Sequence, residues 1–441
     1  MKIGIIGGGI SGLSAAFSLA GQGHQVDVFE TRPEPGGLVS TFDLAGTRIE
    51  RYYHFLCAQD EGYFALCRDL GLADKIRFRK ARTGFFHEGN EYPFTTPLDL
   101  LRFRPIPLHQ RLRFGLFALE ARAKEEWRQL DEIRAKPWLI DRIGLRTYEV
   151  VWEPLLALKF GDLHESISAA WIWHRLHRVA RSKGRMGYLE GGSGLLLDTL
   201  WDRLNARGGK VHLDSPVQGI SLGAGGVEGL VTGDGSFHRF DSVVSTVPLT
   251  VLADLLPGLQ SAYAEALRGI RYIGVVCVVI KLKCRITPCF WLNVNDKRIP
   301  FNGIIEYTNL NPIGPDTGHI AYVPYYVSTA NPLYSADDTA VFDRSWRALR
   351  LIRPGLRDDD VIDHAVFRDE YAQAVCPMGF LGRLPDMQAP IRGLHLLDSA
   401  FLYPEDRTQS GLILKARECA RKIDATAPDP ERGRTGRREQ E

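Results

Sequence analysis

The chain has 441 residues, of which 44% are hydrophobic and 24% charged, and its formal net charge is +2 (55 basic minus 53 acidic). This length predicts two domains, and the composition is typical of a globular protein. The near-neutral charge argues against general nucleic-acid binding, and without a run of about 18 apolar residues no membrane span is expected.

The seven cysteines are scattered, odd in number and lack any C-x-x-C pair. Neither a metal site nor a disulfide is therefore expected, and a reducing compartment fits. The first sequence motif starts at residue 3, so no signal peptide is expected. A cytoplasmic location is the default prediction.

The first thirty residues carry the pattern on which the other predictions depend. Lys2–Ile6 is a short apolar run, typical of a strand buried in a parallel sheet. A full G-x-G-x-x-G follows at Gly7, Gly9 and Gly12, and then apolar residues continue at helical spacing. A second strand is predicted at Gln25–Phe29. The pattern indicates a strand, a glycine turn, a helix and a parallel strand.

Each glycine has a physical role in this arrangement. The first permits the tight turn, the second lets the backbone approach a pyrophosphate, and the third lets the helix pack on the strand. The helix start, which includes Ser11, offers free amides and positive charge to phosphates. Glu30 lies where a carboxylate would accept hydrogen bonds from a ribose. The sequence therefore predicts a dinucleotide site.

The next stretch indicates which dinucleotide binds. Arg32, Gly36 and Gly37 form an R-x-x-x-G-G extension. It resembles that of the flavoprotein group that includes flavin amine oxidases, protoporphyrinogen oxidases, phytoene desaturases and UDP-galactopyranose mutases. A Pro/Gly surface turn is the alternative. The resemblance implies FAD and an α/β fold, with a Rossmann-like FAD-binding domain of the glutathione-reductase type and an interleaved α+β substrate domain.

The resemblance covers nearly the whole chain and implies its division. The FAD-binding domain is expected at residues 1–80, 187–272 and 385–424. The substrate domain is expected as a helical part at 81–186 and a sheet at 273–384. Residues 425–441 are rich in Pro, Arg and Glu, and we expect a disordered tail there.

Further FAD contacts follow from the same resemblance. Val217 matches the place where a valine backbone touches the adenine, and Asp398 matches the acidic residue near the ribityl and phosphates. Gly411 and Leu412 lead into the last helix, whose positive end points at the flavin pyrimidine in the group. Residues 394–412 contain no cysteine, so we expect FAD to be bound non-covalently.

A strand is expected at Ile49–Leu56, beside the isoalloxazine. This segment is similar to the one in galactopyranose mutases that brings a histidine near the flavin, and His54 matches that histidine. The alternative is a histidine whose hydrogen bonds are made within a polar turn and that has no role at the flavin. Further apolar strands are predicted at 274–282, 290–295, 303–309 and 320–327, as the floor of a substrate cavity.

These strands supply the remaining site candidates. His54 and Glu306 are the catalytic candidates, and the expected substrate contacts are Trp291, Asn293, Tyr307 and Tyr322. In amine oxidases the strand equivalent to 274–282 carries a lysine beneath the flavin. Here that place falls near Val278, which argues against an amine oxidase in the strict sense.

The region from 83 to 187 differs in composition. A hairpin is expected at 84–94, and a long helix at 109–133 with Leu112, Leu116 and Leu119 on one face. Two basic and aromatic stretches, 100–124 and 171–185, fit a site for an anionic substrate, a shallow membrane contact or a solvated helix face. His174 and His177 lack a partner for a metal site.

Three functions remain open. The leading one is an FAD-dependent oxidoreductase, in which flavin N5 accepts a hydride from a small organic substrate, anionic or aromatic/prenoid. The second is a mutase-like enzyme that acts on a nucleotide sugar with reduced FAD. The third is a non-catalytic prenyl-binding escort protein similar to the Rab GDP-dissociation inhibitors, which the intact glycines argue against. The sequence does not identify the substrate, the electron acceptor or the oligomeric state.

Overall fold

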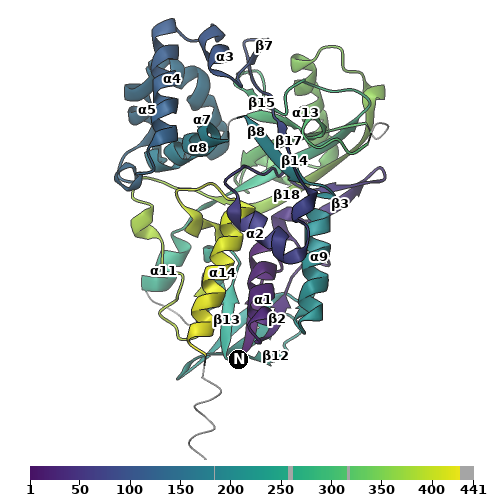
Figure 1. Cartoon of the computed structure of the whole chain (residues 1–441), viewed down its shortest axis with the longest axis vertical. Coiled ribbons are helices and arrows are strands. Elements are labelled where there is room, and N and C mark those ends of the chain that lie inside the picture. Colours follow the sequence, from purple (N-terminus) through teal and green to yellow (C-terminus); the bar gives the residue numbers. More distant parts are fainter. Residues whose placement is uncertain (183, 257–261, 315–317, 428–441) are drawn as a thin grey trace, which may run out of the picture.

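The structure, a computed structural model, describes residues 1–182, 184–256, 262–314 and 318–427. A nucleotide-type domain forms one end of the molecule, around helices α1 and α14 (Figure 1). The other end holds a group of helices on one side and a large sheet on the other (Figure 1). The three parts meet where the strands of the first domain end.

The first domain is built on five parallel strands in the order β19-β13-β1-β2-β9. Their bounds are β1 Lys2–Ile6, β2 Gln25–Phe29, β9 Lys210–His212, β13 Ser242–Ser245 and β19 Leu394–Leu396. Helices α14 (Gln409–Ala425), α1 (Ile10–Gly21) and α9 (Gly192–Ala206) lie side by side over the sheet (Figure 1). Strands from distant parts of the sequence thus share one sheet, because each apolar strand is buried between neighbours.

Smaller elements complete this domain. They are β3 Thr41–Leu44, β4 Thr47–Glu50, α2 Glu61–Leu70, β5 Ile76–Lys80, β8 Arg185–Leu189, β10 Val217–Gly223, β11 Gly226–Thr232, β12 Phe237–Arg239, α10 Leu249–Asp254 and α11 Ala262–Arg268. The strand expected at 49–56 is shorter than predicted, since β4 ends at Glu50. Beyond β4 the chain leaves the hairpin, and Leu56 and Gly187 exchange two backbone hydrogen bonds in an isolated antiparallel bridge.

The second sheet has seven strands in the order β18-β14-β17-β16-β15-β6-β7. Their bounds are β6 Thr83–His87, β7 Asn90–Pro93, β14 Tyr272–Leu282, β15 Trp291–Val294, β16 Gly303–Glu306, β17 His319–Val327 and β18 Val361–Ala374, with helices α12 Pro332–Ser335 and α13 Asp338–Ile352 beside them. Side chains alternate along β14. Val276 and Val278 share a core with Trp346 of α13, whereas Val275 and Cys277 face a cavity.

The helical part contains α3 Pro97–Arg102, α4 Leu108–Ala123, α5 Ala135–Ile143, α6 Leu145–Thr147, α7 Glu153–Phe160 and α8 Ala169–Arg181. The helix predicted at 109–133 therefore ends at Ala123. Its buried residues are Phe114, Phe117 and Ala121, and not the predicted leucine face. Phe117 packs against Trp138 of α5 and Trp173 of α8, which leaves the leucines on the outside.

The predicted α/β class, with a Rossmann-like sheet and a substrate-side α+β region, is confirmed. The domain boundaries stay a prediction. Of the tail expected at 425–441, residues 428–441 lie outside the described residues. Within the part of the chain that the structure describes, no helix combines the length and the apolar character needed to cross a bilayer.

Candidate active site

A cavity of about 880 Å³ lies where the three parts of the molecule meet. One end is lined by the glycine turn after β1, and the other by aromatic residues of the second sheet and the helices. The cavity thus joins a nucleotide-type cradle to a separate chamber. Such concave, mostly apolar sites with a few polar groups are where small molecules bind.

The glycine turn has the shape that a pyrophosphate requires. A side chain at Gly12 would bring its Cβ within 2.0 Å of the Gly7 carbonyl oxygen, so only glycine fits at this position. At Gly9 a Cβ would meet only the Gly36 carbonyl oxygen, at 3.9 Å, and Gly9 lines the cavity. No described side chain caps the start of α1, so its first amides are free for an anion. The open space at Gly9 and these amides fit FAD phosphates.

Glu30 forms the polar wall of this cradle. It is 8% exposed and lines the cavity. Its Oε2 accepts a hydrogen bond from the Gly8 amide at 2.7 Å, and its Oε1 accepts one from the Arg32 amide at 2.9 Å. These bonds fix the carboxylate, and each oxygen keeps acceptor capacity for ribose hydroxyls. Glu30 therefore fits the predicted role.

Most of the other predicted FAD contacts also line the cavity. They are Gly7, Ser11, Arg32, Gly36, Gly37, Val217, Asp398 and Leu412. Burial raises the pKa of Asp398 to about 6, and Tyr272 Oη donates a hydrogen bond to its carboxylate at 2.9 Å. Gly12 and Gly411 are not among the lining residues. The Gly411 amide instead donates to Thr408 Oγ1, which caps α14.

His54 lies in the cavity wall, together with Trp291 and Asn293. Its Nδ1 is buried and has no hydrogen-bond partner among the described residues. Burial, and then the charge of Arg407, lower the pKa of His54 to about 4. The imidazole is therefore neutral at physiological pH and free to bond to a ligand.

Glu306, Tyr307 and Tyr322, which the sequence also predicted as site residues, are not among the residues that line the cavity. Ile305 faces the cavity, and strand alternation turns Glu306 to the other side of the sheet. There it accepts a hydrogen bond from the Ile286 amide at 2.9 Å, and burial raises its pKa to about 8. The two tyrosines are buried in the core next to the cavity. Tyr322 Oη donates to the Glu50 carbonyl oxygen, and the Tyr307 ring packs on the Tyr322 ring.

A cationic cluster that sequence reasoning missed lies at the cavity wall. Lys159 of α7 is nearly buried, and its Nζ lies 3.7 Å from Asp406 Oδ2 and 4.7 Å from the centre of the Tyr326 ring. Arg175 Nη1 lies 2.9 Å from the same carboxylate oxygen. Arg407 Nη2 donates to Tyr326 Oη at 3.3 Å. Two of these cations, Lys159 and Arg175, therefore lie against one carboxylate oxygen, and the third contacts Tyr326.

This cluster sets the local electrostatics. Burial would raise the pKa of Asp406, but Lys159, Arg175 and Arg407 together lower it to about 2. Burial would also raise the pKa of Tyr326, but Arg407 and Lys159 hold it below the ordinary value. Tyr326 in turn is within hydrogen-bond distance of Tyr53, with 3.2 Å between the hydroxyl oxygens. The positive potential favours an anionic group in this part of the cavity.

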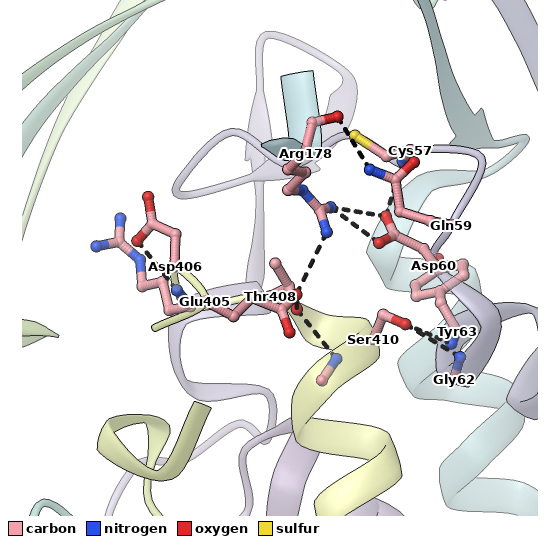
Figure 2. A network of polar contacts seen from close by, with 12 residues as sticks. Cys57, Gln59, Asp60, Gly62, Tyr63, Arg178, Glu405, Asp406, Thr408 and Ser410 are labelled. Carbon is pink, nitrogen blue, oxygen red and sulfur yellow. Dashed lines mark hydrogen bonds and ion pairs between the residues drawn. The ribbon is translucent and has the colours of Figure 1, made fainter. Parts of the chain in front are cut away.

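A second polar network holds the helical part against the nucleotide domain (Figure 2). Arg178 of α8 lies 2.9 Å from Asp60 and 3.3 Å from Glu405. Ser410, in the first turn of α14, accepts a hydrogen bond from the Gly62 amide at 3.0 Å. The basic stretch predicted at 171–185 contained Arg175 and Arg178, but their carboxylate partners come from distant segments. Only the fold could identify these pairs.

Comparisons with known proteins place this site in a family. Residues 10–401 match the model of the flavin containing amine oxidoreductases. The chain belongs to this family of FAD-dependent oxidoreductases. The predicted flavoprotein group, enzyme class and FAD cofactor are thereby confirmed.

Individual relatives are more distant. The chain is 27% identical over 240 residues to a zeta-carotene desaturase from Zea mays. The aligned region is 48% of this chain and only 42% of that desaturase. An oxidoreductase from Methanosarcina mazei has a similar structure, with a TM-score of 0.74 at 19% identity over 95% of this chain and 99% of that one. A reduced UDP-galactopyranose mutase gives a TM-score of 0.76 at 17% identity over 97% and 96%. These structural likenesses show the fold.

Proposed function

We propose that the protein is an FAD-dependent oxidoreductase that acts on an apolar or aromatic organic substrate bearing an anionic group. The observation that carries this proposal is the shared cavity, in which an FAD cradle opens onto an aromatic chamber with three cations at its wall. Bound FAD would accept a hydride from the substrate. The chain itself supplies position, exclusion of water and charge.

The aromatic chamber supports the apolar part of the substrate. Its walls include Phe55, Phe85, Phe94, Phe114, Trp152 and Trp291. Trp291 is held edge-on against Tyr53 and Phe55, with ring centres 5.3 Å and 5.9 Å apart. Such rings offer a large apolar surface in a fixed orientation. An apolar substrate bound there would displace water from the reacting centre.

The cationic cluster supports the anionic part. Lys159 Nζ is close to aromatic rings and to Asp406, yet makes no hydrogen bond within the described chain. A carboxylate or phosphate could therefore accept its hydrogen bonds and those of Arg175, and charge-assisted bonds of this kind are strong. His54, neutral and without a partner at Nδ1, would orient the substrate or take up a proton.

A redox-neutral mutase-like reaction on a nucleotide sugar is the second candidate. It is supported by His54 in the cavity and by the same cations, which suit a diphosphate as well as a carboxylate. No lysine of β14 lines the cavity either, since the residues of this strand that do so are Val275 and Cys277. The two candidates differ in whether the flavin changes its redox state during turnover.

Anaerobic stopped-flow spectroscopy tests both. Purified holoenzyme is mixed with a panel of amines, porphyrinogens, polyprenes and nucleotide sugars, and flavin absorbance is followed. Bleaching of oxidised flavin by a substrate supports the oxidoreductase. Turnover of a nucleotide sugar only after pre-reduction, with no net redox change, would overturn it in favour of the mutase. Acid release of the yellow chromophore checks that FAD is bound non-covalently.

A further inference from the structure

An apolar surface on helices α3 and α4 has no partner in the described chain. It consists of six leucines, which we call the leucine stripe: Leu98, Leu101, Leu108, Leu112, Leu116 and Leu119. Their exposed fractions range from 42% to 68%. Single exposed leucines are common, but a contiguous group of this kind marks an interaction surface.

Helix geometry makes the stripe continuous. The α4 leucines recur at spacings of four, four and three residues, which keeps them on one side of the helix. The opposite side of α4 is buried through Phe114, Phe117 and Ala121. One apolar side would suffice to hold α4 on the protein, so packing of this chain does not account for the second.

Basic residues border the stripe. Arg102, Arg104, Arg113 and Arg122 are all exposed, and none has an acidic partner within 4 Å among the residues that the structure describes. Glu120 is the one acidic residue on α4, and it is paired with Lys124 at 2.8 Å and Arg142 at 3.1 Å. The border of the stripe is therefore positively charged.

We propose that the leucine stripe docks on the surface of an anionic lipid bilayer. The leucines would enter the boundary between headgroups and acyl chains, while the arginines bind lipid phosphates. A second copy of this chain fits less well, because a symmetric contact would bring the same arginine-rich border against itself. The bilayer offers the apolar surface and the negative charge at once.

The same helix forms part of the cavity wall. Phe114, on the buried side of α4, and Phe94, which precedes α3, both line the cavity. Docking through the stripe therefore brings the aromatic chamber next to the membrane surface. If the proposed function holds, an apolar substrate would enter the chamber from the lipid; the docking itself does not depend on that function.

Co-sedimentation of the full-length holoenzyme with vesicles tests the proposal. We expect binding to phosphatidylcholine vesicles that contain roughly one-third phosphatidylglycerol, and weaker binding to pure phosphatidylcholine or at high salt. The triple variant L112S/L116S/L119S should lower the partition coefficient by about tenfold or more, because less apolar area enters the lipid. R104E/R122E should abolish the preference for anionic vesicles. Flavin absorbance and thermal unfolding check that each variant is folded.

The matched control is L351S/I362S/L381S, which changes three apolar residues outside α3 and α4 whose exposed fractions are 42% to 46%. It should bind vesicles like the wild type. Equal binding by wild type and the leucine triple variant would overturn the proposal, as would failure of the wild type to bind anionic vesicles. A wild-type dimer in gel filtration that L112S/L116S/L119S dissociates, without vesicle binding, would assign the surface to a second copy instead.

Discussion

The two halves of the cavity are built on different physical principles. In the FAD cradle the backbone does most of the binding, and function depends on side chains that are absent: Gly9 leaves space, and the start of α1 offers free amides. In the substrate chamber function depends on side chains that are present, such as Lys159 of α7 and Trp291 of β15. These come from segments that are distant in the sequence.

This difference decides how each half responds to change. The cradle is made of contiguous backbone, so a single added methyl group can occupy the space that the cofactor needs. A chamber of separate side chains loses one contact at a time, and its other contacts remain.

The largest effect is expected from the glycines, where a matched pair separates folding from cofactor binding. Gly12→Ala puts a Cβ within 2.0 Å of a backbone oxygen, so we expect a loss of stability of about 3 kcal/mol or more, and little soluble protein. At Gly9 the added Cβ meets only one oxygen, at 3.9 Å, so the Gly9→Val protein should fold but stay colourless. Circular dichroism and flavin absorbance give both readouts. A yellow Gly9→Val protein would contradict the cradle assignment.

The contrast also explains what the sequence could predict. Gly7, Gly9, Gly12 and Glu30 lie close together in the chain, and their spacing alone fixes their positions on a strand, a turn and a helix. His54, Trp291 and Asn293 were predicted through the resemblance to flavoproteins, and they do line the cavity. Here the local signal was short but sufficient.

Sequence reasoning is weakest where the direction of a side chain depends on register. Glu306 is adjacent to the cavity-lining Ile305, and a shift of one residue turns a side chain to the other face of a sheet. Lys159 could not be paired with Asp406 from the sequence, because 247 residues separate them (406 − 159) and neither belongs to a spacing motif. For α4 the leucine periodicity was correct, but only packing decides which apolar side is buried.

In the chamber, His54→Ala should have the largest effect on chemistry. We expect turnover to fall by about 100-fold while FAD stays bound, because His54 contacts the cavity but not the glycine cradle. The pKa of His54 is lowered to about 4, so His54 does not titrate between about pH 5 and pH 8. Any change of activity in that range should therefore be present in both the wild type and His54→Ala. A pH profile with the substrate identified by stopped flow checks this, and unchanged turnover would exclude His54 from the site.

Two buried lysines provide a finer test of the chamber. Lys281 Nζ donates to the Ala45 carbonyl oxygen and Thr47 Oγ1, both at 2.9 Å, so Lys281→Met should cost about 1–3 kcal/mol of stability. Lys159 makes no hydrogen bond within the described chain and its ion pair with Asp406 is long, at 3.7 Å, so Lys159→Met should cost less stability than Lys281→Met. It should instead weaken binding of an apolar acid such as dodecanoate by about tenfold.

Urea unfolding and titration of the flavin spectrum with dodecanoate separate the two lysines. The comparison is sharpest when each variant changes only one readout. If Lys159→Met binds the acid as tightly as the wild type, the cationic cluster is not the site of the anionic group.

The smallest effect on activity is expected at Glu306, which does not line the cavity. Its folded-state pKa of about 8 is above the value of about 4.5 expected in the unfolded chain, because burial disfavours the charged form. Below about pH 4.5 both states are protonated. As pH rises towards 8 only the unfolded chain loses the proton, so this group's contribution to stability falls by about 1.4 kcal/mol per pH unit.

Glu306→Gln cannot ionise and removes this dependence. We expect wild type and variant to be similarly stable near pH 4.5, and the variant to be more stable by on the order of 3 kcal/mol near pH 7. Urea unfolding across this range measures the difference, and parallel pH curves would show that Glu306 ionises normally. Since the carboxyl group faces away from the cavity, Glu306→Gln should also keep full activity. A folded but inactive variant would mean that the reacting face of the sheet is the opposite one.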